Sequence, residues 1–221
     1  MTLPFTCVGC SGFFLRADSW SNIAPRFRKF ICVDDCRDNP QLTLKDYVNA
    51  VCDAMALAPS PYILIGHSFG GWLVAAIMAQ LQEPVDQVVL LSALGFQLGR
   101  SATEVYADSN QQFMHDVCRL NPKLGTLDLA NRSEFVESVF GALSSVHIAR
   151  HESLALITDS IEAPPRPPSR QCLYVVTNQD HLSTPEAQIL YSRHHQARVL
   201  HVHGNHFSTL AQPSWLGAII P

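Results

Sequence analysis

Short apolar runs alternate with stretches of helical periodicity along the first part of the chain. The apolar runs predict strands over residues 5–8, 30–33, 62–65 and 88–91, and the apolar positions at helical spacing predict helices over residues 16–27, 43–57 and 69–81. Thr43 stands where the N-cap of the second helix belongs. Strands that are apolar throughout and alternate with helices are typical of a parallel sheet covered on both faces. The pattern therefore predicts an α/β fold with a mostly parallel sheet flanked by helices.

The alternation stops after residue 95 and resumes near residue 172. Between them the spacing predicts only helical pieces, over residues 102–120, 133–143 and 148–160, followed by a Pro-rich return segment at 162–170. Strands are then predicted over 172–177 and 199–202, and helices over 185–194 and 208–220. We expect a single domain, 1–221, with a helical insert at about 96–160. Ligands bind at the carboxyl ends of strands in open α/β sheets, so the insert is predicted to form a lid there. The alternative is a helical layer with no role in the site.

The segment Gly66-His67-Ser68-Phe69-Gly70 interrupts the pattern between a predicted strand and a predicted helix. So few residues reverse the chain only if the central one has a positive φ and small neighbours leave room for it. G-x-S-x-G in this context is the nucleophile elbow. A phosphate-binding turn is disfavoured because no Lys follows in the Walker position and G-x-G-x-x-G is absent. Ser68 is therefore the candidate nucleophile.

A serine nucleophile needs a base, and ten histidines are available. His206 follows Gly204-Asn205 in the predicted loop between the last strand and the last helix, which is where the base belongs when the chain order is Ser, acid, His. His67 lies inside the elbow and is expected to point away from Ser68. His201, His203 and His206 together also suggest a metal site, but no second ligand cluster accompanies them, so no metal and no cofactor are predicted.

The acid is expected at the end of the strand that follows the insert. Asp180 is the only carboxylate there, so we assign it as the partner of His206. Its alternative role is to cap the helix that begins near Thr184.

An oxyanion hole needs two backbone N–H groups, which we expect from Phe69 and from either Cys10 or Ser11 in the loop after the first strand. Apolar residues of the insert are expected to form one wall of an acyl pocket, although they could equally pack the insert on itself. They are Val105, Tyr106, Phe113, Phe135, Val139, Phe140 and Leu143.

Composition narrows the function classes. A net charge of −4 disfavours binding of nucleic acid or of an anionic membrane surface. No apolar run approaches the length of a membrane span. The opening residues 1–4 carry no basic charge, so no signal peptide is expected. The seven scattered cysteines are read as reduced, structural residues of a cytoplasmic protein.

With strand, elbow, insert, acid and base in this order, the whole chain resembles the α/β-hydrolase family in a compact form that lacks the amino-terminal strands of larger members. "GHSFGG" with "NHFSTL" further resembles thioesterases that release acyl chains from carrier proteins in polyketide and nonribosomal peptide biosynthesis. The resemblance implies Ser68 as nucleophile, His206 as base, Asp180 as acid and Phe69 as an oxyanion donor. It also implies an acyl ester or thioester substrate, and an acyl or peptidyl carrier protein as a partner.

Two departures from this pattern keep alternatives open. Many such thioesterases place the acid after the strand that follows the elbow helix, where this chain has Ser92, and many esterases open the oxyanion stretch with His-Gly, where this chain has Val8-Gly9. The sequence thus predicts a serine hydrolase that releases or cyclises a biosynthetic acyl chain. The alternatives are a small-molecule carboxylesterase, C–C cleavage or other acyl chemistry on the same triad, and a non-catalytic binding protein of this fold.

Overall fold

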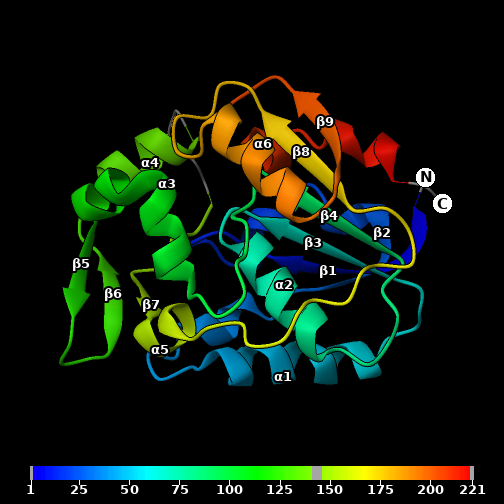
Figure 1. The fold of residues 1–221 in the computed structure, drawn as a ribbon, viewed down its shortest axis with the longest axis horizontal. Helices are drawn as coiled ribbons and strands as arrows, with labels where there is room; N and C mark the ends of the chain where they lie inside the picture. Colours follow the sequence, from blue (N-terminus) through cyan, green and yellow to red (C-terminus); the bar gives the residue numbers. More distant parts are fainter. Residues whose placement is uncertain (1, 141–145, 220–221) are drawn as a thin grey trace.

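A six-stranded sheet runs through the centre of the protein in the order β2-β1-β3-β4-β8-β9, and all of its neighbouring strands are parallel (Figure 1). Its strands are β1 (Leu3–Cys10), β2 (Phe27–Ile31), β3 (Tyr62–His67), β4 (Gln87–Leu91), β8 (Leu173–Thr177) and β9 (Arg198–Val202). The computed structural model describes residues 2–140 and 146–219, and leaves out the side chains of 108–113. The predicted α/β fold with a parallel sheet is confirmed.

Both faces of the sheet are buried. Alternate residues of one strand enter different cores: Leu64 packs toward one face, whereas Ile63 and Ile65 pack toward the other. The first face is covered by α1 (Leu44–Ala56), α2 (Gly70–Gln80) and α6 (Pro185–His194). The second is covered by α7 (Ser208–Ala211) and by the 3₁₀ helices η1 (Ala17–Trp20) and η4 (Ser214–Ala218). The short 3₁₀ helix η2 (Ala24–Arg26), which has no buried residue, leads from η1 to β2. A further 3₁₀ helix, η3 (Asp34–Asp38), follows β2.

The segment between β4 and β8, here called the insert, lies to one side of the sheet in Figure 1. It contains α3 (Ala102–Val117), β5 (Cys118–Asn121), β6 (Thr126–Leu129), α4 (Arg132–Phe140), β7 (His151–Ser153) and α5 (Leu154–Thr158). Strands β5, β6 and β7 form a small antiparallel sheet. The prediction of a purely helical insert is therefore wrong. Each of these strands has at most four residues, which is too short to display a clear alternation of apolar and polar positions.

Two predicted helices are shorter than expected, and proline accounts for both. The stretch 16–27 is divided into η1 and η2 with Pro25 in the second, and the last predicted helix ends at Ala211, before Pro213. In contrast, α1 begins as predicted: Thr43 and Asp46 form a reciprocal capping box. Among the described residues, no helix is both long enough and apolar enough to cross a lipid bilayer.

Candidate active site

Ser68 occupies the sharp turn between β3 and α2 with a φ of 54°. This left-handed conformation is costly for a residue with a side chain, so the surroundings must enforce it. The neighbouring glycines permit the turn because the backbone passes very close to them. A Cβ on Gly66 would lie 2.6 Å from the Gly70 carbonyl oxygen, and a Cβ on Gly70 would overlap the Cys10 carbonyl oxygen. The elbow geometry that the motif predicts is present.

His206 and Asp180 lie in direct contact. Nδ1 of His206 is 2.6 Å from Oδ2 of Asp180, and both side chains are almost fully buried. Asp180 follows the end of β8, and His206 lies between β9 and α7. The loops that carry them are tied together, because the Gln179 amide donates to the Gly204 carbonyl and the Gly204 amide donates to the Asn178 side chain. The carboxylate–imidazole contact expected from the sequence is thus present.

The Asp180 carboxylate is surrounded by donors. Its Oδ1 accepts from the amides of Leu182 and Ser183, both at 2.9 Å, and its Oδ2 accepts from Thr177 Oγ1 and Gln188 Nε2 as well as from His206. Burial alone would raise the pKa of Asp180, but His206 and these hydrogen bonds hold it below its usual value. The carboxylate is therefore charged at neutral pH, and it accepts a hydrogen bond from Nδ1–H of His206. In a neutral imidazole this leaves Nε2 as the basic nitrogen.

Ser92, at the alternative acid position, also joins this group. Its hydroxyl lies 2.8 Å from the Thr177 hydroxyl, which in turn donates to Asp180. Ser92 thus supports the residue that holds the carboxylate but carries no charge of its own.

Ser68 and His206 line the same small cavity. Its other walls are mainly apolar: Gly12, Phe13, Phe14, Leu15, His67, Tyr106, Met114, Phe135, Val139 and Leu182. Nε2 of His206 is buried and, within the described parts of the chain, has no hydrogen-bond partner. A basic nitrogen and a serine hydroxyl thus meet at a small apolar cavity, the arrangement needed to activate that hydroxyl against a bound carbonyl group.

Three of the insert residues proposed as an acyl wall do line this cavity: Tyr106 from α3, and Phe135 and Val139 from α4. Val105 is buried in the core without reaching the cavity, and the Phe140 ring packs against Phe207 at 4.4 Å between centroids. The side chain of Phe113 and the whole of Leu143 lie outside the described residues. Sequence reasoning missed Phe13, Phe14, Met114 and Leu182, of which the first two directly follow Gly12 in the loop after β1.

His67 does not point away from the site, as the sequence suggested. Its side chain lines the cavity beside Ser68, and its Nε2–H donates to the His206 carbonyl oxygen at 2.9 Å. Burial, together with the nearby His206 ring, lowers the pKa of His67 to about 3. His67 is therefore neutral, and its hydrogen bond links the elbow to the loop that carries His206.

The second oxyanion donor differs from the expected pair. The Ser11 amide donates to Asp34 Oδ2 at 2.7 Å, so Ser11 is unavailable, and Cys10 belongs to β1 and does not line the cavity. Gly12 is the residue of this loop that comes closest to the elbow: a Cβ on it would lie 3.4 Å from Ser68 Oγ. Within the described part of the chain, the amides of Gly12, Phe13 and Phe69 donate no hydrogen bond, and of these Phe69 directly follows Ser68 while Phe13 shares a peptide unit with the Gly12 carbonyl. We take the amides of Phe69 and Phe13 as the candidate donors, because Phe69 follows Ser68 in the chain and Phe13 lines the cavity beside it.

The three histidines near the end of the chain do not gather. His206 is buried against Asp180, whereas His201 and His203 are exposed. In the ranges that the structure describes, no cluster of three His, Cys, Asp or Glu side chains is arranged as a metal site.

Sequence and structure comparisons identify the family. The profile described as "Alpha/beta hydrolase family" matches residues 7–218, nearly the whole chain. The protein belongs to the alpha/beta hydrolase family. No curated protein is similar enough in sequence to indicate a closer relative of this alpha/beta hydrolase.

Solved structures agree with this family at the level of the fold. A pyrethroid hydrolase from Sphingobium faniae JZ-2 superposes on this alpha/beta hydrolase with a TM-score of 0.80 at 16% identity, over 98% of this chain and 95% of the other. Polyneuridine aldehyde esterase superposes with a TM-score of 0.74 at 21% identity, over 96% of this chain and 95% of the other. A methylesterase from Arabidopsis superposes with a TM-score of 0.69 at 17% identity, over 97% of this chain and 96% of the other.

The neutral state of His67 makes the stability of this alpha/beta hydrolase dependent on pH. An unfolded histidine takes up a proton below about pH 6.5, whereas folded His67 does so only near pH 3. Between these values the unfolded state binds more protons, so the free energy of unfolding falls as the pH falls, by up to about 1.4 kcal/mol per pH unit. We expect His67→Gln to reduce this slope by about that amount in urea unfolding between about pH 4 and 6. The matched variant of exposed His201, His201→Gln, should retain the wild-type slope, and an unchanged slope in His67→Gln would contradict a buried neutral His67.

Proposed function

We propose that this chain is a serine hydrolase of small carboxylic esters, with Ser68 as nucleophile, His206 as base and Asp180 as acid. The observation that carries the proposal is the 2.6 Å contact between Asp180 and His206 at the cavity that Ser68 lines. A binding protein of this fold needs the cavity but has no need of a buried carboxylate that four other donors hold against a histidine. The esterases and hydrolases among the similar folds support the same reaction class.

The chemistry follows from the proton on Nδ1 of His206. Because that proton is committed to Asp180, Nε2 takes the proton of the Ser68 hydroxyl as Oγ attacks the ester carbonyl carbon. The Ser68–His206 hydrogen bond forms when the substrate is bound, as catalytic contacts commonly do. The tetrahedral oxyanion accepts hydrogen bonds from the amides of Phe69 and Phe13. The carbon–oxygen bond to the alcohol breaks, the alcohol departs with the proton from His206, and the acyl group remains on Ser68 Oγ as an acyl-enzyme. Water, deprotonated by Nε2 of His206, then attacks this ester and releases the carboxylic acid, and His206 returns the proton to Ser68.

Cavity size and lining indicate the substrate class. The cavity is small, and its walls from Phe13, Tyr106, Phe135 and Val139 offer apolar contact without a charged partner. We therefore propose a neutral ester with a short or compact acyl group.

The alternative substrate class is thioesters. It is supported by the resemblance of "GHSFGG" and "NHFSTL" to biosynthetic thioesterases. The same triad would cleave a thioester, and an internal nucleophile on the acyl chain would give cyclisation instead of hydrolysis. A carrier-protein partner rests on that resemblance alone. Simple esters come first because the cavity is small and the similar solved structures include a methylesterase and an aldehyde esterase.

A substrate panel tests the proposed function. Wild type should hydrolyse p-nitrophenyl esters and methyl esters, with kcat/KM highest for short acyl chains and falling once the chain exceeds the cavity. Ser68→Ala should remove this activity and leave the circular dichroism spectrum and Tm close to those of wild type. Acyl thioesters of the same chains, tested in parallel, decide between the two substrate classes. Absence of Ser68-dependent turnover on every ester and thioester would reject the hydrolase and favour the binding protein.

The acid assignment is tested by two neighbouring substitutions. Asp180→Asn removes the charge that fixes the His206 tautomer and stabilises the imidazolium, so kcat should fall by about 10³–10⁴-fold, as in serine proteases. Ser92→Ala removes only a hydrogen bond to Thr177 and should change kcat by less than about tenfold. A near-normal kcat in Asp180→Asn, at a Tm that shows the variant folded, would contradict Asp180 as the acid.

A further inference from the structure

Arg37 is a fully buried cation that lies directly behind the loop facing Ser68. It belongs to η3, and its guanidinium donates from Nη1 to the Ser11 carbonyl at 3.1 Å and from Nη2 to the Gly12 carbonyl at 3.2 Å. It also lies over the ring of Phe69, 5.2 Å from the centroid. Arg37 does not line the cavity. The guanidinium therefore binds the backbone next to one proposed oxyanion donor, Phe13, and packs on the side chain of the other, Phe69.

The planarity of the peptide bond gives these contacts a consequence at the cavity. In a trans peptide the C=O and the N–H point in opposite directions. The peptide unit that contains the Gly12 carbonyl also contains the Phe13 N–H. The Gly12 carbonyl accepts from Arg37 and also from the Leu15 amide at 3.2 Å. Because these donors hold the carbonyl on the buried side, the Phe13 N–H is directed to the opposite side, where Gly12 and Phe13 line the cavity with Ser68. A charged donor on the carbonyl also polarises the peptide unit and makes its N–H a stronger donor.

We propose that Arg37 is a positioning residue for ester hydrolysis: it fixes and polarises the Gly12–Phe13 peptide so that the Phe13 N–H stabilises the oxyanion. This inference rests on the proposed function. Arg37 acts through the backbone and touches neither the substrate nor the reacting atoms.

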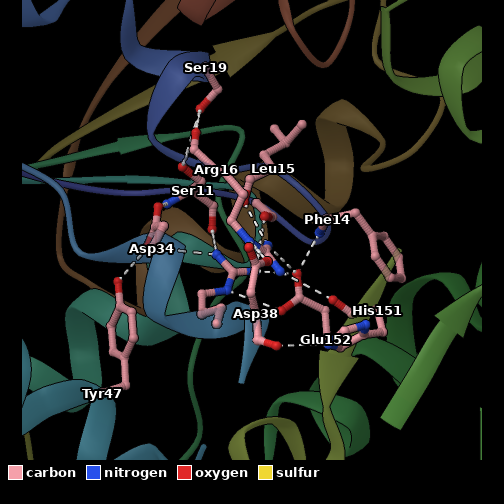
Figure 2. Close-up of polar contacts among 12 residues, drawn as sticks. Ser11, Phe14, Leu15, Arg16, Ser19, Asp34, Asp38, Tyr47, His151 and Glu152 are labelled. Carbon is pink, nitrogen blue, oxygen red and sulfur yellow. Dashed lines mark hydrogen bonds and ion pairs between the residues drawn. The ribbon is translucent and has the colours of Figure 1, made fainter. Parts of the chain in front are cut away.

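Two buried carboxylates keep Arg37 in place and hold the same loop. Glu152, from β7 of the insert, accepts from Arg37 Nη2 at 2.5 Å and Nε at 3.1 Å, and also from the Phe14 amide at 2.6 Å. Asp34 accepts from the Ser11 amide and from the Tyr47 hydroxyl, both at 2.7 Å. Figure 2 shows Asp34 and Glu152 on either side of the loop that runs from Ser11 to Phe14. The amides of Ser11 and Phe14 and the carbonyls of Ser11 and Gly12 are thus bound by buried charged side chains, whereas the Phe13 amide between them donates no hydrogen bond in the described part of the chain.

Arg16 provides a matched control in the same cluster. It is almost as buried as Arg37 and shares Glu152, at 3.1 Å, but its other contacts are with Asp38 and the carbonyls of Leu15 and His151. It therefore contributes a similar charge without holding the Ser11 or Gly12 carbonyl. Replacing either arginine should lower the stability of the fold, whereas only replacing Arg37 should weaken stabilisation of the oxyanion.

The test compares Arg37→Met with Arg16→Met in hydrolysis of p-nitrophenyl acetate, at a temperature where thermal melts show both variants folded. Loss of an oxyanion-hole donor costs about 10²–10³-fold in kcat, so Arg37→Met should lose about 10²-fold in kcat. Its KM should stay within about threefold, because the uncharged ground-state carbonyl depends little on the hole. Arg16→Met should keep kcat within about threefold. Arg37→Lys retains the charge but holds the two carbonyls less well, so its kcat should fall by about tenfold. If Arg37→Met does not fold, Arg37→Lys takes its place.

The outcomes separate this inference from the proposed function. If wild type shows no Ser68-dependent hydrolysis, the proposed function fails and the role of Arg37 fails with it. If wild type is active but the folded Arg37 variants keep wild-type kcat, only the role of Arg37 is wrong. An equal fall in kcat for Arg16→Met and Arg37→Met would also overturn it, because the effect would then come from the cluster as a whole.

Discussion

The ion pair between Arg37 and Glu152 joins three parts of the fold that are distant in sequence. Arg37 follows β2, Glu152 lies 115 residues later in the insert, and both bind the loop after β1. Burial alone would lower the pKa of Arg37, and the carboxylates of Glu152 and Asp34 raise it above its usual value, so the guanidinium stays charged. Removing one partner of a buried pair leaves an uncompensated charge, at a cost of about 3–5 kcal/mol. The insert is therefore held to the sheet at one specific position, directly behind the candidate site.

This position matters because the cavity is built from both parts. The sheet supplies Ser68 at the end of β3 and the loop that carries Phe13, while the insert supplies Tyr106, Phe135 and Val139. An insert held elsewhere would leave Ser68 without its apolar walls. The elbow itself depends on a second close contact, in which α2 begins against the Cys10 carbonyl with only a glycine, Gly70, at the point of approach. Packing of α2 against β1 and pairing of Glu152 with Arg37 thus fix the two sides of the same cavity.

The sequence was sufficient to predict those parts of the site that depend on neighbouring residues in the chain or on the order of the strands. The glycines around Ser68 predict a positive φ, and the position of Asp180 and His206 after successive strands predicts their contact, because parallel strands end at the same edge of a sheet. The sequence was not sufficient to predict the parts of the site that depend on contacts between residues distant in the chain. The orientation of His67 depends on the His206 carbonyl, 139 residues away, and the Ser11 amide is occupied by Asp34 from a different strand end. Charged residues such as Arg37 and Glu152 give no sign in sequence that they are buried, since burial requires a partner that only the fold provides.

The central claim is that Ser68 forms a covalent acyl-enzyme. Wild-type protein mixed with p-nitrophenyl acetate, quenched in acid within the first turnovers and digested, can be analysed by mass spectrometry for the added acetyl group. Asp180→Asn should retain the label for longer, because water attack on the acyl-enzyme uses the same base. We predict the acetyl mass on the peptide that contains Ser68 and its absence from Ser68→Ala. Burial raises the pKa of Cys10 and Cys118, so their thiols are poor competitors. Acetyl mass on a cysteine peptide, or equal labelling of Ser68→Ala, would contradict the assignment.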